Sequence, residues 1–178
     1  MAEVEHHPES ESKALPPADL DQPPTERNER PVGIEGNLEV KPPDPSDFDR
    51  EALARVYRLM LTSRRLDEKM MTLLKQGRGF FHIGGAGHEA AQAAIGMYAR
   101  PGHDWFAFYY RDLCMALSLG LSPREALLAH LAKDDDPNSG GRQMPEHFGL
   151  KDKNVITTSS SVGAQFLPGL GLGLAAQR

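Results

Sequence analysis

The amino-acid sequence predicts an α/β fold in which helices pack against a parallel β-sheet. Helical patterns alternate with two short stretches typical of buried strands, "HDWFAFYY" at residues 103–110 and "NVITT" at residues 154–158. Helices between two strands are the connection that a parallel sheet requires. Ligands bind to such sheets beyond the carboxyl ends of the strands, where loops lead into helices. The loops with that position here are "FFHIGGAG", "YYRD" and "TTSSSVGAQ".

Composition divides the 178 residues into two parts. Residues 1–45 hold nine of the 14 prolines, no aromatic residue, and eleven acidic against four basic side chains. Such a segment buries too little apolar surface to offset its ordering entropy, which predicts a disordered acidic arm. The net charge is −5 for the chain and −7 for the arm, leaving +2 on residues 46–178, the predicted folded domain. A nearly neutral domain lacks the basic surface expected for nucleic-acid binding.

The start of the chain and its cysteine content bear on location. "MAEVEHHPESESK" lacks the basic start and apolar run of a signal peptide, and no stretch approaches the roughly 18 apolar residues of a membrane span. We therefore expect a cytoplasmic protein without a membrane contact. The single cysteine, Cys114, excludes an internal disulfide and a thiolate metal cluster. Its apolar helical surroundings, "RDLCMALSLG", predict an inert core cysteine.

A long amphipathic helix is predicted after the arm. Ser46, Asp47 and Asp49 are cap-type residues, and Gly77 marks the end. Its four arginines favour a solvated face, with a partner-binding face as the alternative: Arg55, Arg58, Arg64 and Arg65. The apolar residues repeat at three and four: Leu53, Val56, Tyr57, Met60 and Leu61, then Leu66, Met70, Leu73 and Leu74.

Shorter helices are predicted around the strands. "GRGFFHIGGAG" interrupts the helical pattern, which resumes at residues 88–99, 112–119 and 123–133. Ser122, Pro123 and Glu125 form the start signal of the last of these, and its His130 is expected to be a surface or half-buried histidine. Residues 134–150 read as a loop. The end of the chain turns helical despite glycines at 169, 171 and 173, each costing up to ~1 kcal/mol, which predicts close approach to another backbone.

Arg111 is the first candidate functional residue. It ends the aromatic strand just ahead of a helix, where a guanidinium beside free backbone N–H groups suits a phosphate. A structural ion pair with Asp112 or a neighbour is the equally weighted alternative.

The remaining candidates lie in the glycine-rich and serine-rich loops. His82 is a candidate proton donor in a pocket lined by Phe80 and Phe81. A metal site of His82 with His88 and Glu89 is disfavoured, because the spacing matches no usual zinc pattern. "GGAG" is not a dinucleotide fingerprint, and "TTSSSVGAQ" is not a serine-nucleophile elbow. These signals indicate part of a cofactor site rather than a complete catalytic set.

Four motifs together carry a resemblance to a known family. In order, "FFHIGGAGHEAAQAA", "FYYRD", "GGRQMPEHFG" and "SSSVGAQFLPGLGLGLA" resemble the α subunit of the thiamine-diphosphate-dependent 2-oxo acid dehydrogenase E1 component, over residues 50–178. "GRQMPEHFG" is more similar to the branched-chain (2-oxoisovalerate) type than to the pyruvate type. The resemblance implies a doubly wound α/β fold of the thiamine-diphosphate-binding type, of which this chain is an N-terminal part.

The resemblance also implies an activity. It is oxidative decarboxylation of a branched-chain 2-oxo acid, 3-methyl-2-oxobutanoate, with transfer of the acyl group to the lipoyl group of E2. The implied cofactors are thiamine diphosphate and Mg²⁺, and the implied partners are E2 and an E1 β subunit or fused β half. Pyruvate or acetoin dehydrogenase activity is one alternative, and a truncated, non-catalytic fragment is another.

Residue roles follow from the matched motifs. Tyr110 and Arg111 match residues that contact the diphosphate, and Ser160 and Val162 match those that meet the aminopyrimidine. On the substrate side, the resemblance implies a catalytic role for His82 and for His147, whose loop approaches the reacting carbons. The implied pocket residues are Phe80, Phe81 and Tyr109, and Ser159, Ser161 and Gln165 fall where relatives hold potassium, although Ala164 replaces a threonine ligand there.

The sequence also departs from the family pattern. "GHEA" stands where GQEA is common, and the GDG...N segment that binds Mg²⁺ is expected beyond Arg178. The glutamate that activates the aminopyrimidine belongs to the β subunit. We therefore expect no metal ligand for the cofactor within this chain and no activity of the chain alone.

Overall fold

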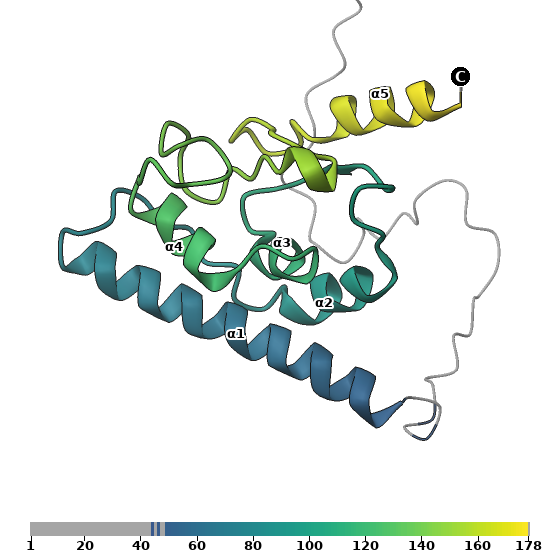
Figure 1. Ribbon diagram of the computed structural model, residues 1–178, viewed down its shortest axis with the longest axis horizontal. Helices are drawn as coiled ribbons and strands as arrows, with labels where there is room; N and C mark the ends of the chain where they lie inside the picture. Colours follow the sequence, from purple (N-terminus) through teal and green to yellow (C-terminus); the bar gives the residue numbers. More distant parts are fainter. Residues whose placement is uncertain (1–43, 45, 47–48, 178) are drawn as a thin grey trace, which may run out of the picture. The chain divides into compact units, whose positions relative to one another are not determined.

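The computed structural model describes residues 44, 46 and 49–177. The arm predicted for residues 1–45 lies outside this part of the chain except for Asp44. The described residues belong to one compact unit, Pro43–Arg178. Its elements are α1 (Arg50–Lys75), α2 (Glu89–Tyr98), β1 (Phe106–Ala107), α3 (Leu113–Ser118), α4 (Pro123–His130), η3 (Lys151–Lys153), β2 (Val155–Ile156) and α5 (Phe166–Ala176), shown in Figure 1.

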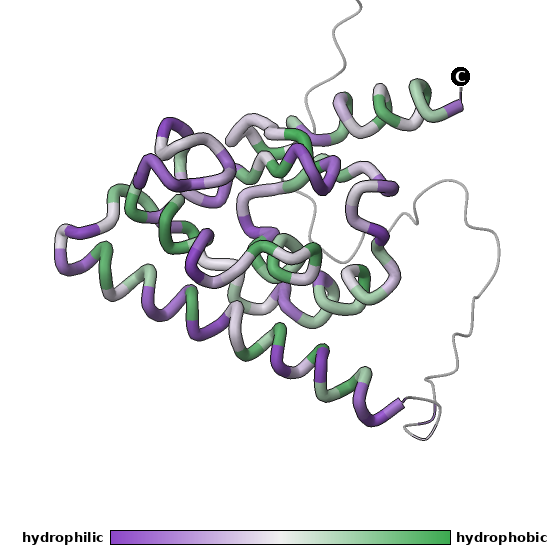
Figure 2. The backbone as a smooth tube through the Cα atoms, in the orientation of Figure 1, coloured by the Kyte–Doolittle hydropathy of each residue, from purple (hydrophilic) through white to green (hydrophobic). Residues whose placement is uncertain are grey.

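The long predicted helix is confirmed as α1. The Asp49 carboxylate caps its N-terminus by accepting hydrogen bonds from the backbone N–H groups of Glu51 and Ala52. Apolar and polar residues alternate along α1 in Figure 2, and its C-terminal half carries the buried face, Ser63, Leu66, Asp67, Met70 and Leu73. The four arginines predicted on a solvated face are all exposed: Arg55, Arg58, Arg64 and Arg65. Arg64 reaches α2, where its Nε lies 2.7 Å from a carboxylate oxygen of the buried Glu89.

β1 and β2 form a two-stranded parallel sheet, with Phe106 opposite Val155 and Ala107 opposite Ile156. The parallel pairing confirms the predicted α/β class. The strands are shorter than predicted, because turns occupy both ends of the 103–110 segment. Asp104 accepts a hydrogen bond from the backbone N–H of Arg100 at one end, and the Asp112 N–H donates to the Tyr109 carbonyl at the other.

The core lies where α3 meets α1, α4 and the strands. It is built around residues with almost no exposed surface, including Met70, Leu113, Cys114 and Ala116, and α2 packs on α1 and α3. Cys114 is a core residue as predicted, and burial raises its pKa to about 11. The expectation for His130 is wrong. It ends α4 with no exposed surface at all, because the glycine-rich segment covers it: a Cβ on Gly79 would come within 2.4 Å of the His130 Nε2.

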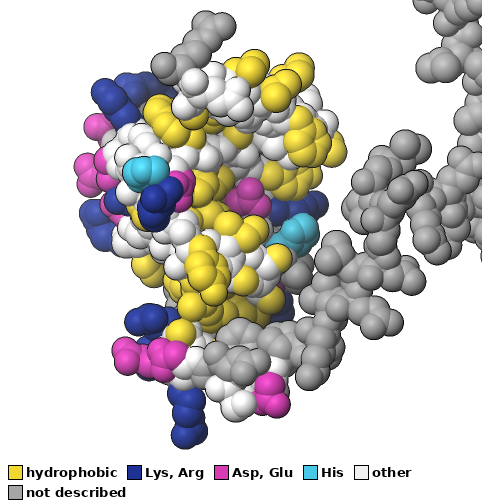
Figure 3. All heavy atoms as spheres, turned by 90° about the vertical axis from the view of Figure 1, so that its right-hand side faces the viewer, with side chains coloured by type: hydrophobic (Ala, Val, Ile, Leu, Met, Phe, Trp, Pro, Cys, Tyr) yellow, Lys and Arg dark blue, Asp and Glu magenta, His cyan; other side chains and the backbone are white. Residues whose placement is uncertain are grey.

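α5 contacts β1 and leaves much of its apolar surface exposed. Gly169 supports the predicted close approach, since a Cβ there would lie 3.9 Å from the Ala107 Cβ. A Cβ on Gly171 or Gly173 would meet no atom of the described residues within 4 Å, so these two glycines do not support it. Yellow hydrophobic side chains are visible in Figure 3 at the height of α5, whose exposed apolar residues are Phe166, Leu167, Leu170 and Leu174. Within the described residues, no helix has both the length and the apolar character needed to cross a bilayer.

Candidate functional site

The loop "NSGGRQMPEHFG", residues 138–149, is an ordered turn held by Asp136. The Asp136 carboxylate accepts hydrogen bonds from the backbone N–H groups of Asn138, Ser139 and Gly141. Burial would raise the pKa of Asp136, but hydrogen bonds from the Asn138 and Ser139 side chains, together with those from the backbone, hold it below its usual value. Gly141 has a φ of +71°, and a Cβ there would lie 2.6 Å from the backbone of Ala132. Only glycine fits this position without strain.

This loop places His147 beside two other predicted site residues. The His147 and Tyr110 rings stack with centroids 6.0 Å apart, and the His147 Nε2 lies 2.6 Å from the Ser160 Oγ. The His147 Nδ1 lies 3.1 Å from the Pro145 carbonyl oxygen. A carbonyl can only accept, so Nδ1 carries a proton, and in a neutral ring Nε2 accepts from the Ser160 hydroxyl. The structure therefore brings Tyr110, His147 and Ser160 together from three separate motifs.

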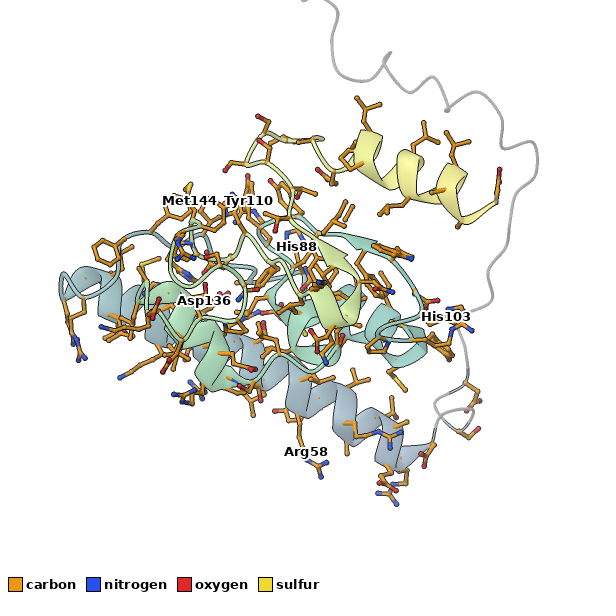
Figure 4. All side chains as sticks on the ribbon, turned by 45° about the horizontal axis from the view of Figure 1, so that its top comes forward. Arg58, His88, His103, Tyr110, Asp136 and Met144 are labelled. Carbon is orange, nitrogen blue, oxygen red and sulfur yellow. The ribbon has the colours of Figure 1, made fainter. Side chains whose placement is uncertain are left out.

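Tyr110 is also held from its other side. The Tyr109 and Tyr110 ring centroids are 3.9 Å apart, and the Tyr109 hydroxyl donates to the Tyr110 hydroxyl at 2.5 Å. This hydrogen bond and partial desolvation raise the pKa of Tyr110. The labels of Tyr110 and Met144 stand next to each other in Figure 4. The Met144 sulfur lies 3.9 Å from the Ser160 Oγ. The Tyr110 ring and the Ser160 hydroxyl thus both lie beside His147 in the 138–149 loop.

Arg111 is available to an anion. Its Nη1 donates to the Gly84 carbonyl at 2.6 Å, and its guanidinium lies 5.6 Å from the centre of the Tyr110 ring. Among the described residues, no carboxylate forms an ion pair with Arg111. Asp112, the suggested partner, instead accepts from the Tyr109 backbone N–H at 2.8 Å and from the Gln92 Nε2 at 3.0 Å. This geometry favours the anion-binding interpretation over a structural ion pair.

The glycine-rich segment approaches Arg111 closely. A Cβ on Gly85 would lie 2.7 Å from the Arg111 carbonyl oxygen, so a side chain at this position would separate the two loops. The Gly85 N–H donates to the Asp67 carboxylate at 2.9 Å, which ties the segment to α1. Close packing of backbone on backbone here is a physical reason for glycine.

His82 lies in a buried cluster of charged groups. Its Nδ1 is 2.5 Å from a Glu146 carboxylate oxygen, its Nε2 is 3.4 Å from an Asp67 oxygen, and its side chain is 1% exposed. Burial alone would lower the pKa of His82, but the adjacent carboxylates of Asp67 and Glu146 outweigh burial and raise the pKa to about 9. Phe80 is 76% exposed, and Phe81 is half-buried. The catalytic role of His82 stays a prediction, and the ring offers little surface through which to reach a substrate.

Asp67 and Glu146 are site residues that the sequence did not reveal. Asp67 lies on the buried face of α1. The sequence pattern identifies buried positions by their apolar residues, so a buried aspartate is not recognised from it. Glu146 adopts a φ of +64°, and its carboxylate accepts from the Ile83 N–H at 3.3 Å as well as contacting His82. A non-glycine residue with positive φ indicates local strain that its surroundings maintain.

The other predicted residues do not join this cluster. Val162 is 82% exposed, and Ser159 and Ser161 are exposed near the start of α5, where Gln165 is the N-cap residue. Their cofactor and potassium roles stay predictions. Glu89 accepts hydrogen bonds from Arg64 and from the Gly87 N–H, so it is committed to the α1–α2 contact, in keeping with the disfavoured metal site at His88 and Glu89.

The fold and the site together define an α/β protein in which an arginine without an ion-pair partner among the described residues lies next to a cluster of tyrosine, histidine and serine side chains. The family profile described as the dehydrogenase E1 component matches residues 57–178. The chain belongs to this family, as the resemblance predicted.

Individual relatives agree with the family assignment. The chain is 40% identical over 127 residues to a Bacillus subtilis 2-oxoisovalerate dehydrogenase subunit alpha, covering 71% of this chain and 38% of the relative. It is 25% identical over 150 residues to the human mitochondrial 2-oxoisovalerate dehydrogenase subunit alpha, covering 78% and 31%. It is 30% identical over 132 residues to a Staphylococcus aureus pyruvate dehydrogenase E1 component subunit alpha, covering 74% and 33%. The chain thus spans about a third of the length of these relatives.

Proposed function

We propose that this chain is part of the E1 α subunit of a branched-chain 2-oxo acid dehydrogenase that uses thiamine diphosphate and Mg²⁺. The convergence of Tyr110, His147 and Ser160 beside an unpaired arginine among the described residues carries the proposal. The doubly wound architecture of the thiamine-diphosphate-binding type belongs to the same proposal, and the parallel β1–β2 pair is compatible with it.

The residues present fit the proposed cofactor. Arg111 has guanidinium N–H groups beyond the one bonded to Gly84, and these can bind a diphosphate oxygen. Tyr110 can contact the same group through its hydroxyl, and Ser160 and Val162 can meet the aminopyrimidine. When bound, thiamine diphosphate supplies the electron sink that decarboxylation of a 2-oxo acid requires, while the protein orients the reactants.

His147 is the side chain that we propose to act on the substrate. Its Nδ1–H is directed to the Pro145 carbonyl, which leaves Nε2 as the atom that can accept or return a proton. The Ser160 hydroxyl occupies Nε2 in the described structure, so substrate would replace Ser160 as the partner of this nitrogen. The Tyr110 ring beside it limits the orientations open to the imidazole.

The proposed substrate is 3-methyl-2-oxobutanoate, which loses CO₂, and its acyl group passes to the lipoyl disulfide of E2, which is reduced; a β subunit or fused β half completes the site. Identity to the Bacillus subtilis 2-oxoisovalerate relative favours this substrate. Pyruvate is the second candidate, because a pyruvate dehydrogenase subunit is also a relative. Turnover of the two acids by the full-length product with its β partner distinguishes them, and a higher kcat/KM for pyruvate would overturn the branched-chain assignment.

Calorimetric titration tests the cofactor proposal. The full-length gene product is expected to bind thiamine diphosphate only when Mg²⁺ is present, and Arg111→Met should weaken that binding. Arg58→Met, on the exposed surface of α1, is the matched control. Absence of Mg²⁺-dependent binding by the full-length protein would overturn the proposal. A cytoplasmic location and inactivity of the 178-residue chain alone are further parts of it, checked by fractionation and by assay of the purified chain.

A further inference from the structure

A second polar cluster lies under the glycine-rich segment. His82, His130 and Glu146 each place one nitrogen or oxygen within 4.8 Å of the other two. The His82 and Glu146 side chains are 1% and 3% exposed, and His130 has no exposed surface. The two imidazole rings meet edge to face with centroids 5.7 Å apart.

His130 has no hydrogen-bond partner within the described chain. Both of its ring nitrogens are buried, and burial lowers the pKa of His130 although the neighbouring Met70 backbone opposes the shift. An unsatisfied buried nitrogen destabilises the folded state, so such groups are rare in folded proteins. A ligand that binds a nitrogen lone pair would remove this destabilisation.

Asp67 stands in the position of an orienting group for His82. Its Oδ1 also lacks a hydrogen-bond partner in the described structure and lies 3.4 Å from the His82 Nε2, while Glu146 faces the opposite ring nitrogen, Nδ1. A histidine that binds a metal through one nitrogen usually donates its other N–H to a carboxylate. Asp67 can accept that hydrogen bond when Nδ1 binds a cation.

The charges of the cluster suit a divalent cation. A metal ion would displace the Nδ1 proton of His82 and leave its Nε2–H directed at Asp67. The two carboxylates then carry two negative charges beside neutral imidazoles, and buried charges require a partner. Imidazole nitrogen with carboxylate oxygen is a ligand set that Zn²⁺ accepts readily, whereas Mg²⁺ prefers oxygen ligands and retains water.

We propose that His82, His130 and Glu146 bind one Zn²⁺ ion, with Asp67 orienting His82. The ion would join the end of α4, the glycine-rich segment and the 138–149 loop, and through Asp67 it would be linked to α1. Its role is to hold the loop that carries His147 in place. This site is separate from the Mg²⁺ of the proposed function, and its test does not depend on catalysis.

Zinc binding is measured on the untagged 178-residue chain. His6→Gln and His7→Gln are made in every sample, because these two histidines lie outside the described residues and can bind zinc themselves. Calorimetry with ZnCl₂ should show one ion per chain, and zinc should raise the Tm, while MgCl₂ should do neither. Replacement by Co²⁺ should give the intense visible absorption of a low-symmetry nitrogen–oxygen site.

Variants then identify the ligands. His130→Gln and Glu146→Gln should each weaken zinc binding by more than about 100-fold, and Asp67→Asn by roughly 10- to 100-fold, as expected for an orienting group. His103→Gln, an exposed histidine with a 68% exposed side chain, should retain the parent affinity. Circular dichroism without zinc shows whether each variant is folded. If a variant is unfolded, the cobalt spectrum of the parent chain decides.

Two outcomes would overturn the proposal. One is the absence of stoichiometric zinc binding and of a cobalt spectrum in the folded parent chain. The other is parent-like zinc affinity in folded His130→Gln and Glu146→Gln. Neither outcome bears on thiamine diphosphate binding by the full-length protein, so the two proposals fail separately.

Discussion

The imidazole of His147 stacks on the Tyr110 ring, with centroids 6.0 Å apart and planes inclined by 23°, while its Nε2 lies 2.6 Å from the Ser160 Oγ. One histidine therefore joins the end of the β1 segment to the serine-rich loop. Arg111 follows Tyr110 in the chain, and its guanidinium lies 5.6 Å from the centre of the same ring. Binding of the proposed cofactor and action on the substrate are thus assigned to neighbouring but separate side chains.

His147→Ala in the full-length enzyme with its β partner should lower kcat/KM by about 10²–10⁴-fold, the range expected for loss of a proton-transfer group. Thiamine diphosphate affinity should change little, because His147 is not among the residues that we assign to the cofactor. Steady-state kinetics and calorimetry measure the two effects. His103→Ala is the control, and a kcat/KM for His147→Ala equal to that of the control would assign this histidine a structural role only.

Gly141→Ala should destabilise the folded chain by about 1–3 kcal/mol, since the new Cβ meets the Ala132 backbone in a left-handed conformation. Gly171→Ala is the matched control. It lies in α5 with no described atom within 4 Å, so the same substitution should stabilise by up to ~1 kcal/mol. Urea unfolding of both variants checks the difference in sign. Equal free energies of unfolding would show that the 138–149 loop can relax around a methyl group.

Arg64→Met should destabilise the chain at neutral pH, because it leaves the buried Glu89 carboxylate without its main partner. Hydrogen bonding to Arg64 lowers the pKa of Glu89 in the folded state. The stabilisation is therefore present above the unfolded-state pKa and is lost as pH falls through the lower, folded-state pKa.

The pH dependence of unfolding tests this ion pair. The free-energy difference between the parent chain and Arg64→Met should shrink as the solution is made acidic enough to protonate Glu89. Arg58→Met, exposed on α1, should match the parent at every pH. A difference that stays constant down to acid pH would mean that Arg64 stabilises by packing of its stem rather than by its charge.

Cys114 should resist thiol reagents in the folded chain. Cys114 is 1% exposed, so a reagent hardly reaches its sulfur. Burial raises its pKa to about 11, so only a small fraction of the thiol is ionised at pH 8. A disulfide-exchange reagent should label the single thiol rapidly in denaturant and at least about 100-fold more slowly without it, in line with the fraction of thiolate that such a pKa allows. Equally fast labelling in both states would show that the α3 region opens readily.

Local signals in the sequence predicted the helices well. The Asp49 cap, the capping box of Ser122 and Glu125, and the apolar spacing of α1 each act within a few residues, and each appears in the structure. The strands were overestimated, because the Asp104 and Asp112 carboxylates accept hydrogen bonds from the backbone and stabilise turns on either side of the two paired positions. The sequence could not decide between an anion site and an ion pair for Arg111, because the position of Asp112 was unknown. In the structure Asp112 bonds to Gln92 and Tyr109, which leaves Arg111 without an ion-pair partner among the described residues.

The sequence by itself determined the helical caps, the α/β alternation, the core position of Cys114 and the motifs that indicate the E1 component family. Only the tertiary structure decided which polar groups meet. His82 and Glu146 are 64 residues apart in the sequence yet 2.5 Å apart in space, and His130 is buried rather than exposed. Periodicity reports which face of a helix turns inward, whereas a contact between distant side chains depends on how loops close over that face.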